Sequence, residues 1–399
     1  MRAPGPSAAD GVRRSALRFV LLIGVVSMFS DMAHEGARSI TGPFLGTLGA
    51  SAAVVAAVAG FGELLGYALR SVVGFVADRT GRYWPITLLG YVVQMAAVPA
   101  LALAGNWQVA AVLIAAERGG RAIRNPARDA MLAHATGELG SGWVFGVREA
   151  LDAAGATVGP LIVAAVLATG HGYRAGFAIL AVPALLTVVV LLGARRQYPD
   201  PGDLEAGEEI PGRHGIPRVF WLYLLAMGLI ALGYADYPLI AFHFSTGHVI
   251  SADWIPVLYA GAMATEAVAA LVLGRLFDRV GLLTVVGATV LTAAFAPLVF
   301  LGDAALAVVG VICWGLGMAV QESVVKAAVT GMVGRDRRAS AYGLFDTGFG
   351  VLWFAGSFVL GVLYDHSLDG LVVYSVVAQL AALPLLLAVH RRTAPRAPA

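Results

Sequence analysis

Charged residues are scarce in this sequence of 399 residues. They make up 13% of the chain, against about 25% in soluble globular domains, whereas hydrophobic residues make up 59% and the mean hydropathy is +0.79. This balance excludes an ordinary soluble protein. Apolar runs recur from about residue 17 to about residue 390, so we expect a protein that crosses the bilayer many times and has lipid as its main partner.

Cysteine is almost absent as well. Cys313 is the single cysteine, which excludes an intramolecular disulfide and leaves no cysteine cluster for a structural metal. No small-residue cleavage site follows the apolar run from Phe19 to Phe29, so we predict an uncleaved first helix instead of a removed signal peptide.

The sequence also lacks the marks of an enzyme. Ser30, Asp31 and His34 are the nearest approach to a catalytic set, but they occupy neighbouring turns of one helix without an evident oxyanion hole. Walker-type phosphate loops are missing too, which argues against transport driven directly by ATP. We therefore predict no catalytic residue, no metal and no cofactor, and the net charge of +2 gives no support to nucleic-acid binding.

Twelve apolar stretches are long enough to cross about 30 Å of hydrocarbon. The first six lie near residues 17–46, 51–77, 83–104, 107–132, 142–169 and 173–193. The second six lie near residues 218–244, 253–276, 282–302, 304–332, 339–364 and 369–389. Residues 195–217, rich in proline, glycine and charge, predict a linker. We thus expect an all-α membrane protein with six-helix bundles in residues 1–194 and 218–399, forming a monomer.

Arginines gather in alternate loops, which predicts the orientation. Arg174 is the clear basic residue on one side. The other side holds Arg2, Arg13, Arg14, Arg18, Arg79, Arg82, Arg195, Arg196, Arg213, Arg218, Arg275, Arg279, Arg335, Arg337, Arg338, Arg391, Arg392 and Arg396. Because positive loops stay inside, both termini and the linker are predicted to be cytoplasmic, in a bacterial inner membrane.

The two halves repeat a loop motif. Residues 74–81 read Gly-Phe-Val-Ala-Asp-Arg-Thr-Gly, and residues 274–281 read Gly-Arg-Leu-Phe-Asp-Arg-Val-Gly. Glycine, aspartate, arginine and glycine therefore recur after about 200 residues, as expected for parallel repeats. A duplicated six-helix unit, with the two halves related by pseudo-symmetry, explains this pattern most simply.

Two six-helix halves, a cytoplasmic linker and this loop motif resemble the major facilitator superfamily over essentially the entire chain. The resemblance implies that the motif latches the two halves on the cytoplasmic side, through Gly74, Asp78, Arg79, Gly81, Arg82, Gly274, Asp278 and Arg279. Residues 30–45 and 117–130 resemble a bacterial branch described as drug or metabolite exporters. Gly155, Gly159 and Pro160 resemble a pattern associated with antiporters, although close helix packing through small residues explains them equally well.

The first helix carries Asp31, His34, Glu35 and Arg38, whose spacing places all four on one helical face. Each ionised group near the bilayer centre costs roughly 2.5–3.5 kcal/mol, so this face must line a cavity or meet partners. We expect Glu35 to pair with Arg38, and we predict that Asp31, His34 and Glu35 carry protons. A permanently paired structural network is the competing interpretation.

Other intramembrane charges are candidates for substrate contact. The predicted substrate-binding residues, in addition to Arg38, are Glu63, Tyr67, Glu117, Arg118, Asp236, Glu266 and Glu322. We expect Arg148 to pair with Asp152 within the fifth helix.

Together these features predict a secondary transporter that works by alternating access, with proton-coupled export of a small polar or amphipathic molecule as the leading hypothesis. Uptake by proton symport, uncoupled facilitation, and a non-transporting membrane receptor or assembly protein remain alternatives.

Overall fold

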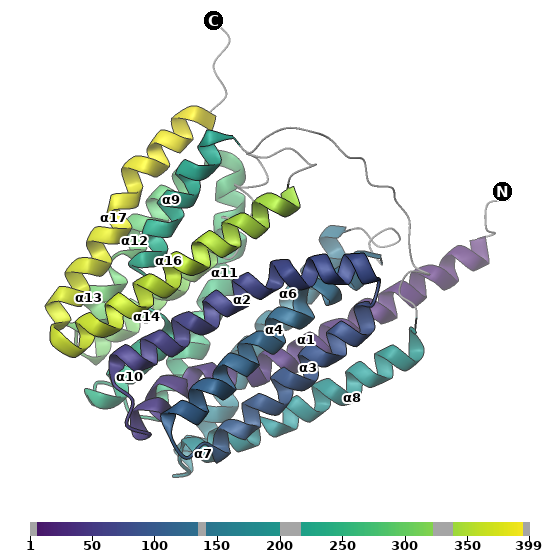
Figure 1. Cartoon of the computed structure of the whole chain (residues 1–399), viewed down its shortest axis with the longest axis horizontal. Helices are drawn as coiled ribbons and strands as arrows, with labels where there is room; N and C mark the ends of the chain where they lie inside the picture. The colour runs from purple at the N-terminus through teal and green to yellow at the C-terminus, as the bar shows by residue number, and fades with distance from the viewer. Residues whose placement is uncertain (1–5, 135–140, 200–216, 322–337, 394–399) are drawn as a thin grey trace, which may run out of the picture. The chain divides into compact units, whose positions relative to one another are not determined.

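A computed structural model describes residues 6–134, 141–199, 217–321 and 338–393; Figure 1 shows it. In this part of the chain the regular structure is helical and includes no strand. The N-terminal helices are α1 (Pro6–Thr47), α2 (Ala52–Thr80), α3 (Tyr83–Ala100) with the short η1 (Leu101–Leu103), α4 (Trp107–His134), α6 (Ser141–Ala168), α7 (Tyr173–Ile179) and α8 (Ala181–Gln197).

The C-terminal helices continue the pattern. They are α9 (Arg218–Leu232), α10 (Tyr237–Thr246), α11 (Trp254–Val280), α12 (Leu283–Thr292), α13 (Phe295–Phe300), α14 (Ala304–Ala319), α16 (Arg338–His366) and α17 (Leu368–Thr393). When η1, α8, α10 and α13 are joined to the helices that precede them, the described residues form the twelve predicted segments.

Ten of these segments are long and apolar enough to cross a membrane. The described part of α14 is a shorter apolar helix, and α4 is long but rich in arginine. This confirms the prediction of a multi-pass membrane protein.

The chain forms two compact units. Unit 1 comprises Met1–Ala37, Leu69–Ala104 and Val109–Glu209, and unit 2 comprises Arg38–Ala68, Gly105–Gln108 and Ile210–Ala399. The last turns of α1 and more than half of α2 thus belong to unit 2. The division into bundles at 1–194 and 218–399 remains a prediction.

The repeated loop motif has the same local backbone in both places. Gly81 has φ +63° and Gly281 has φ +61°, a left-handed conformation that glycine adopts without a steric penalty. Each ends a helix in the same way, since the Gly81 N–H donates to the Ala77 carbonyl at 2.9 Å and the Gly281 N–H donates to the Phe277 carbonyl at 2.8 Å. The sequence repeat is therefore also a repeat of local structure.

The seventh predicted stretch is not a single continuous helix. The helix stops after Leu232 and restarts at Tyr237, although the apolar sequence runs through the break. Side chains replace the missing helical bonds: Ser375 Oγ donates to the Gly233 carbonyl at 2.6 Å, and Trp314 Nε1 donates to the Ala235 carbonyl at 2.8 Å. Non-helical backbone is tolerated at membrane depth where protein groups bond it in this way.

Candidate functional site

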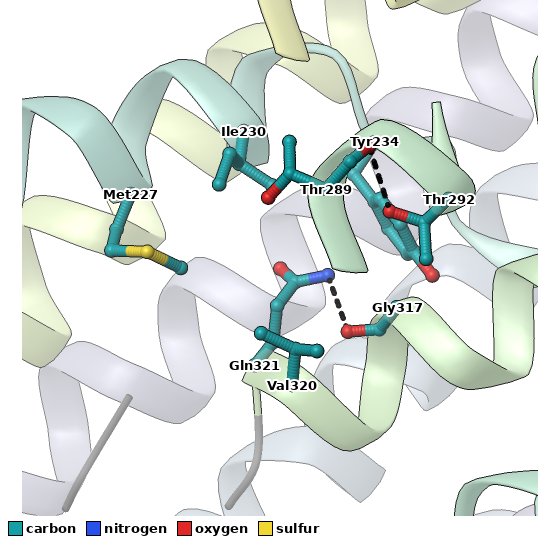
Figure 2. Close-up of a pocket in the computed structure, with 8 residues that line it drawn as sticks. All are labelled: Met227, Ile230, Tyr234, Thr289, Thr292, Gly317, Val320 and Gln321. Carbon is teal, nitrogen blue, oxygen red and sulfur yellow. Dashed lines mark hydrogen bonds between the residues drawn. The ribbon is translucent and has the colours of Figure 1, made fainter. Parts of the chain in front are cut away.

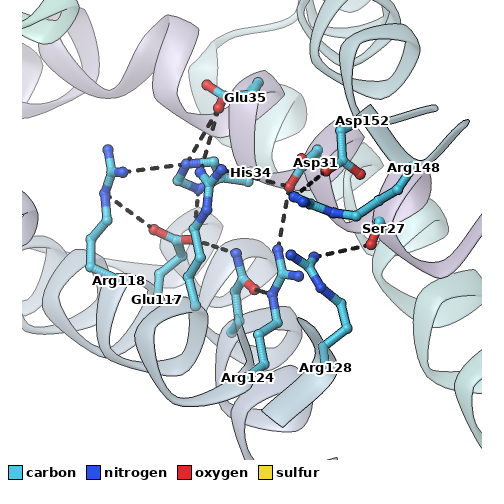
Figure 3. Close-up of polar contacts among 12 residues, drawn as sticks. Ser27, Asp31, His34, Glu35, Glu117, Arg118, Arg124, Arg128, Arg148 and Asp152 are labelled. Carbon is cyan, nitrogen blue, oxygen red and sulfur yellow. Dashed lines mark hydrogen bonds and ion pairs between the residues drawn. The ribbon is translucent and has the colours of Figure 1, made fainter. Parts of the chain in front are cut away.

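The charged face of α1 is buried in protein. Asp31, His34 and Glu35 are 6%, 1% and 6% exposed, and Figure 3 shows them turned toward arginine and glutamate side chains of α4. The partners come from unit 1, so this network is internal to that unit. The requirement that these costly charges meet partners is therefore satisfied.

Asp31 is bound by arginines of α4. Its Oδ1 lies 3.3 Å from Arg124 Nη2 and 4.0 Å from Arg121 Nη2. Arg124 is fully buried and also donates to Tyr91 Oη at 3.0 Å, with its guanidinium carbon 4.5 Å from the centre of the Tyr91 ring. The ring contact and the hydrogen bonds compensate for the lost hydration of Arg124.

His34 forms the second centre of the network. Its Nδ1 lies 2.6 Å from Glu117 Oε1, and its Nε2 lies 3.3 Å from Arg118 Nη1 and 3.6 Å from Glu35 Oε1. Glu35 in turn lies 3.5 Å from Arg121 Nη1. The His34 imidazole thus contacts the carboxyl groups of Glu117 and Glu35 and the guanidinium of Arg118. This arrangement is suited to taking up and releasing a proton.

Gln94 of α3 links the two centres. Its Nε2 donates to Glu117 Oε1 at 2.8 Å, while its Oε1 accepts from Arg124 Nε at 2.6 Å. Sequence reasoning missed this residue. Its signal was a polar amide within an otherwise apolar helix.

Two further pairs extend the network toward α6. Arg128 donates to Ser27 Oγ at 3.0 Å and to Asp129 at 2.9 Å. Arg148 donates to Asp152 Oδ2 at 2.7 Å, which confirms the pair predicted within the fifth membrane stretch.

Unit 2 holds a second charged cluster. Arg38 Nη2 lies 3.3 Å from Glu63 Oε1 and 3.5 Å from Asp236 Oδ1. Asp236 stands at the restart of the broken α9–α10 helix, where its Oδ2 accepts from Trp353 Nε1 at 3.0 Å and from Ser357 Oγ at 2.9 Å. Asp236 Oδ2 is thus hydrogen-bonded across helices, whereas its buried Oδ1 has, among the described residues, only the ion pair with Arg38. The predicted substrate residues Arg38, Glu63 and Asp236 come together.

Aromatic side chains adjoin this cluster. Tyr67 makes an edge contact with Phe349 at 5.8 Å between ring centres, and Phe349 contacts Trp353 at 5.6 Å. Ser357 on α16 is a candidate that the sequence did not indicate, because its part in the cluster depends on its contact with Asp236.

The remaining predicted residues are placed as follows. Glu266 lies half-buried on α11, and Glu322 falls outside the described residues. Arg79, Arg82, Asp278 and Arg279 are exposed beside the left-handed glycines, and Arg79 lies over the Phe75 ring. Gly74 faces Pro126 of α4, whereas a side chain at Gly274 would meet open space.

Gly155 and Gly159 pack directly on α1. A Cβ at Gly155 would collide with the Met28 carbonyl, and one at Gly159 with the Met32 carbonyl. The close-packing interpretation of these glycines therefore describes their contacts, and Pro160 continues the same buried face of α6.

A small pocket lies in unit 2 (Figure 2). It is lined by Met227, Ile230, Tyr234, Thr289, Thr292, Gly317, Val320 and Gln321. The hydroxyls of Thr289 and Thr292 already donate to carbonyls of α12. This lining carries no charged side chain, so the pocket suits an ionic solute less well than the two clusters do.

Comparison with known proteins gives a consistent picture. The family model described as Major Facilitator Superfamily matches residues 20–357. An uncharacterized protein of Mycobacterium tuberculosis is 40% identical over 383 residues, covering 94% of each chain. An uncharacterized MFS-type transporter of Methanocaldococcus jannaschii is 26% identical over 386 residues, covering 94% of this chain and 95% of its own length.

Solved transporters have the same fold. The nucleoside transporter NupG aligns with a TM-score of 0.71 at 15% identity, over 95% of this chain and 100% of that one. The peptide transporter POT bound to sulfate aligns with a TM-score of 0.71 at 16% identity, over 94% and 95%. Identities this low show the shared fold alone.

Proposed function

This chain belongs to the Major Facilitator Superfamily, and from that premise we propose that it is a secondary active transporter that exports a small polar or amphipathic organic molecule in exchange for protons. That it is a membrane transporter of this superfamily, and not an enzyme, follows from the family match and the MFS-type relative. The coupling, the direction and the class of solute are the proposal.

The buried network around His34 is the observation that carries the proposal. An imidazole contacts Glu117 and Glu35 in a place with little water. A permanently paired scaffold would need only matched ion pairs, whereas an imidazole between carboxylates can also take up or release a proton. Asp31, His34 and Glu35 are therefore assigned to proton coupling.

Substrate binding is assigned to the other intramembrane charged residues and to Tyr67. Arg38, Glu63, Tyr67 and Asp236 offer both charge signs beside aromatic rings, which suits a solute with polar and apolar parts. Glu117, Arg118, Glu266 and Glu322 complete the proposed set. The nucleoside and peptide transporters that share the fold support a transporter of small molecules without naming its solute.

Alternating access needs a closure that opens and shuts. The exposed loop motif around Arg79 and Arg279 is proposed as the cytoplasmic latch, with both termini on the same side. Fusing a fluorescent reporter that folds only in the cytoplasm to the C-terminus tests the orientation; a dark, fully expressed fusion would reverse it.

A thermal-shift screen of metabolites and antibiotics on the purified protein identifies the solute. A compound that binds the folded state adds about 2.7 kcal/mol to the free energy of unfolding when its free concentration is about 100 times its dissociation constant. A compound found this way is then loaded into proteoliposomes with an imposed pH gradient.

Antiport predicts that the compound crosses the membrane in the direction opposite to the flow of protons. Replacing Asp31 by asparagine should abolish the response to the gradient, because the residue can no longer change charge, whereas the exposed Asp369→Asn control should retain it. Movement with the protons would indicate symport, and flux that ignores the gradient would indicate facilitation. No binding and no flux with any compound would leave a receptor or assembly protein.

A further inference from the structure

Two buried arginines determine the hydrogen-bond directions in the unit 1 network. An arginine guanidinium donates hydrogen bonds and never accepts them. Arg118 Nη1 lies 3.3 Å from His34 Nε2, so this ring nitrogen must present its lone pair. The ring proton is then on Nδ1, which donates to Glu117 Oε1 at 2.6 Å.

The same rule orients Gln94. Arg124 Nε donates at 2.6 Å to one end of the amide, so that end is the carbonyl oxygen. The NH2 group therefore faces Glu117 Oε1 at 2.8 Å. Glu117 Oε1 therefore accepts from both His34 and Gln94, so this oxygen carries no proton in this state.

The backbone makes this arrangement possible. A Cβ at Gly90 would lie 2.6 Å from the Gly120 carbonyl oxygen, and a Cβ at Gly120 would lie 2.7 Å from the Gly90 carbonyl oxygen and from the Gln94 amide nitrogen. The two glycines let α3 and α4 approach closely. This approach places the fully buried Gln94 within reach of both Arg124 and Glu117.

We propose that Gln94 is a positioning residue for proton uptake: it holds Glu117 as the acceptor of the His34 Nδ1 proton, so that the ring gains and loses protons at Nε2. This proposal rests on the proton coupling proposed above and deepens it. Gln94 exchanges no proton itself. It acts through the geometry of Glu117.

The proton step is balanced as follows. A hydronium ion gives a proton to His34 Nε2 and becomes a water molecule, and the ring charge changes from zero to +1. The new N–H can no longer accept from Arg118, and Glu35 Oε1, at 3.6 Å, becomes its acceptor. The charged groups that face His34 are Asp31 and Glu35 on α1 and Glu117, Arg118 and Arg121 on α4.

Nuclear magnetic resonance of the full chain, labelled with ¹⁵N-histidine in lipid nanodiscs, tests the proposal. The chain has eight histidines, and the His34 signals are those lost in His34→Gln. In the wild-type neutral ring we expect a protonated Nδ1 and an unprotonated Nε2. A neutral ring that carries its proton on Nε2 would overturn the proposal without any Gln94 variant.

Gln94→Leu is the diagnostic variant. Without the amide, Glu117 loses the hydrogen bond that fixes its position. We therefore expect the His34 spectrum to show a mixture of the Nδ1–H and Nε2–H tautomers. Gln379→Leu is the matched control, because Gln379 is equally buried but bonds Gly233 and Ser375 in unit 2; it should leave the His34 signals unchanged. An unchanged spectrum in folded Gln94→Leu would contradict the proposal.

These results are separable from the proposed function. The spectra need no substrate, so the predicted tautomer without any proton-driven flux would remove proton coupling but keep the geometry. Proton-driven flux whose pH profile is the same in Gln94→Leu and the wild type would keep the transporter and remove the role of Gln94.

Discussion

Asp31 and Arg124 form a buried pair of opposite charges. Their nitrogen–oxygen distance is 3.3 Å and Arg124 is 1% exposed. Removing one partner of such a pair leaves the other charge buried and unpaired, a cost of about 3–5 kcal/mol. The pair therefore connects stability to the same residues that are assigned to coupling.

A double-mutant cycle tests this pairing. We expect Asp31→Asn and Arg124→Gln each to lower the free energy of unfolding, and the double variant to lose less than the sum by about 0.5–3 kcal/mol. Reversible denaturation in detergent measures all four proteins. Asp31→Asn combined with the exposed Asp369→Asn should be additive; additivity in the Asp31–Arg124 cycle would show that the pair does not interact.

For single residues, the sequence predicted which charged side chains lie in the membrane better than it predicted which side chains they contact. The Arg148–Asp152 pair follows from a spacing of four along one helix, so it was predictable. Glu35 was expected to pair with Arg38. The structure also places Glu35 beside His34 and Arg121, and Arg38 beside Glu63 and Asp236. Most of these partners come from other helices, and the Glu35–Arg38 pair stays a prediction.

Helices α1 and α6 meet through glycines. Because the Met32 carbonyl occupies the place of a Cβ at Gly159, an alanine there must push the helices apart. We expect Gly159→Ala to destabilise the protein by about 1–3 kcal/mol, measured as a fall in thermal stability.

Gly146 on the same helix is the matched control. Nothing lies within 4 Å of the position its Cβ would take. Alanine is the better helix former by about 1 kcal/mol, so Gly146→Ala should be neutral or stabilising. Equal losses at both positions would show that helix propensity, not contact with α1, governs the effect.

Element boundaries were largely predictable, but the breaks were not. Hydropathy locates a membrane stretch to within a few residues because it depends on the local sequence. The break between α9 and α10 instead depends on Trp314 and Ser375, which bond its carbonyls from elsewhere in the chain. A local pattern contains no information about such donors.

One carboxylate connects distant parts of unit 2. Asp365, at the end of α16, accepts from the amides of Ala52 and Ala53 at 3.1 and 3.0 Å and so caps the start of α2. Amides at a helix start lack partners within their helix. The cap joins segments that are more than 300 residues apart in the chain.

We expect Asp365→Ala to release this end of α2. Loss of a capping acceptor costs about 0.5–2 kcal/mol, so hydrogen exchange at Ala52 and Ala53 should accelerate by roughly 2–30-fold. Asp369→Ala, four residues further on, is the control. Unchanged hydrogen exchange in Asp365→Ala would mean that the cap does not stabilise the first turn of α2.

The sequence by itself determined the membrane class, the twelve stretches, the duplicated motif and the family, because each depends on composition or on spacing along one segment. Tertiary structure alone decided which charges meet, that Gln94 joins them, and where the seventh stretch unwinds. The physical reason is that a buried charge or a bare carbonyl must be satisfied in three dimensions, and its partner can come from any helix that packs against it.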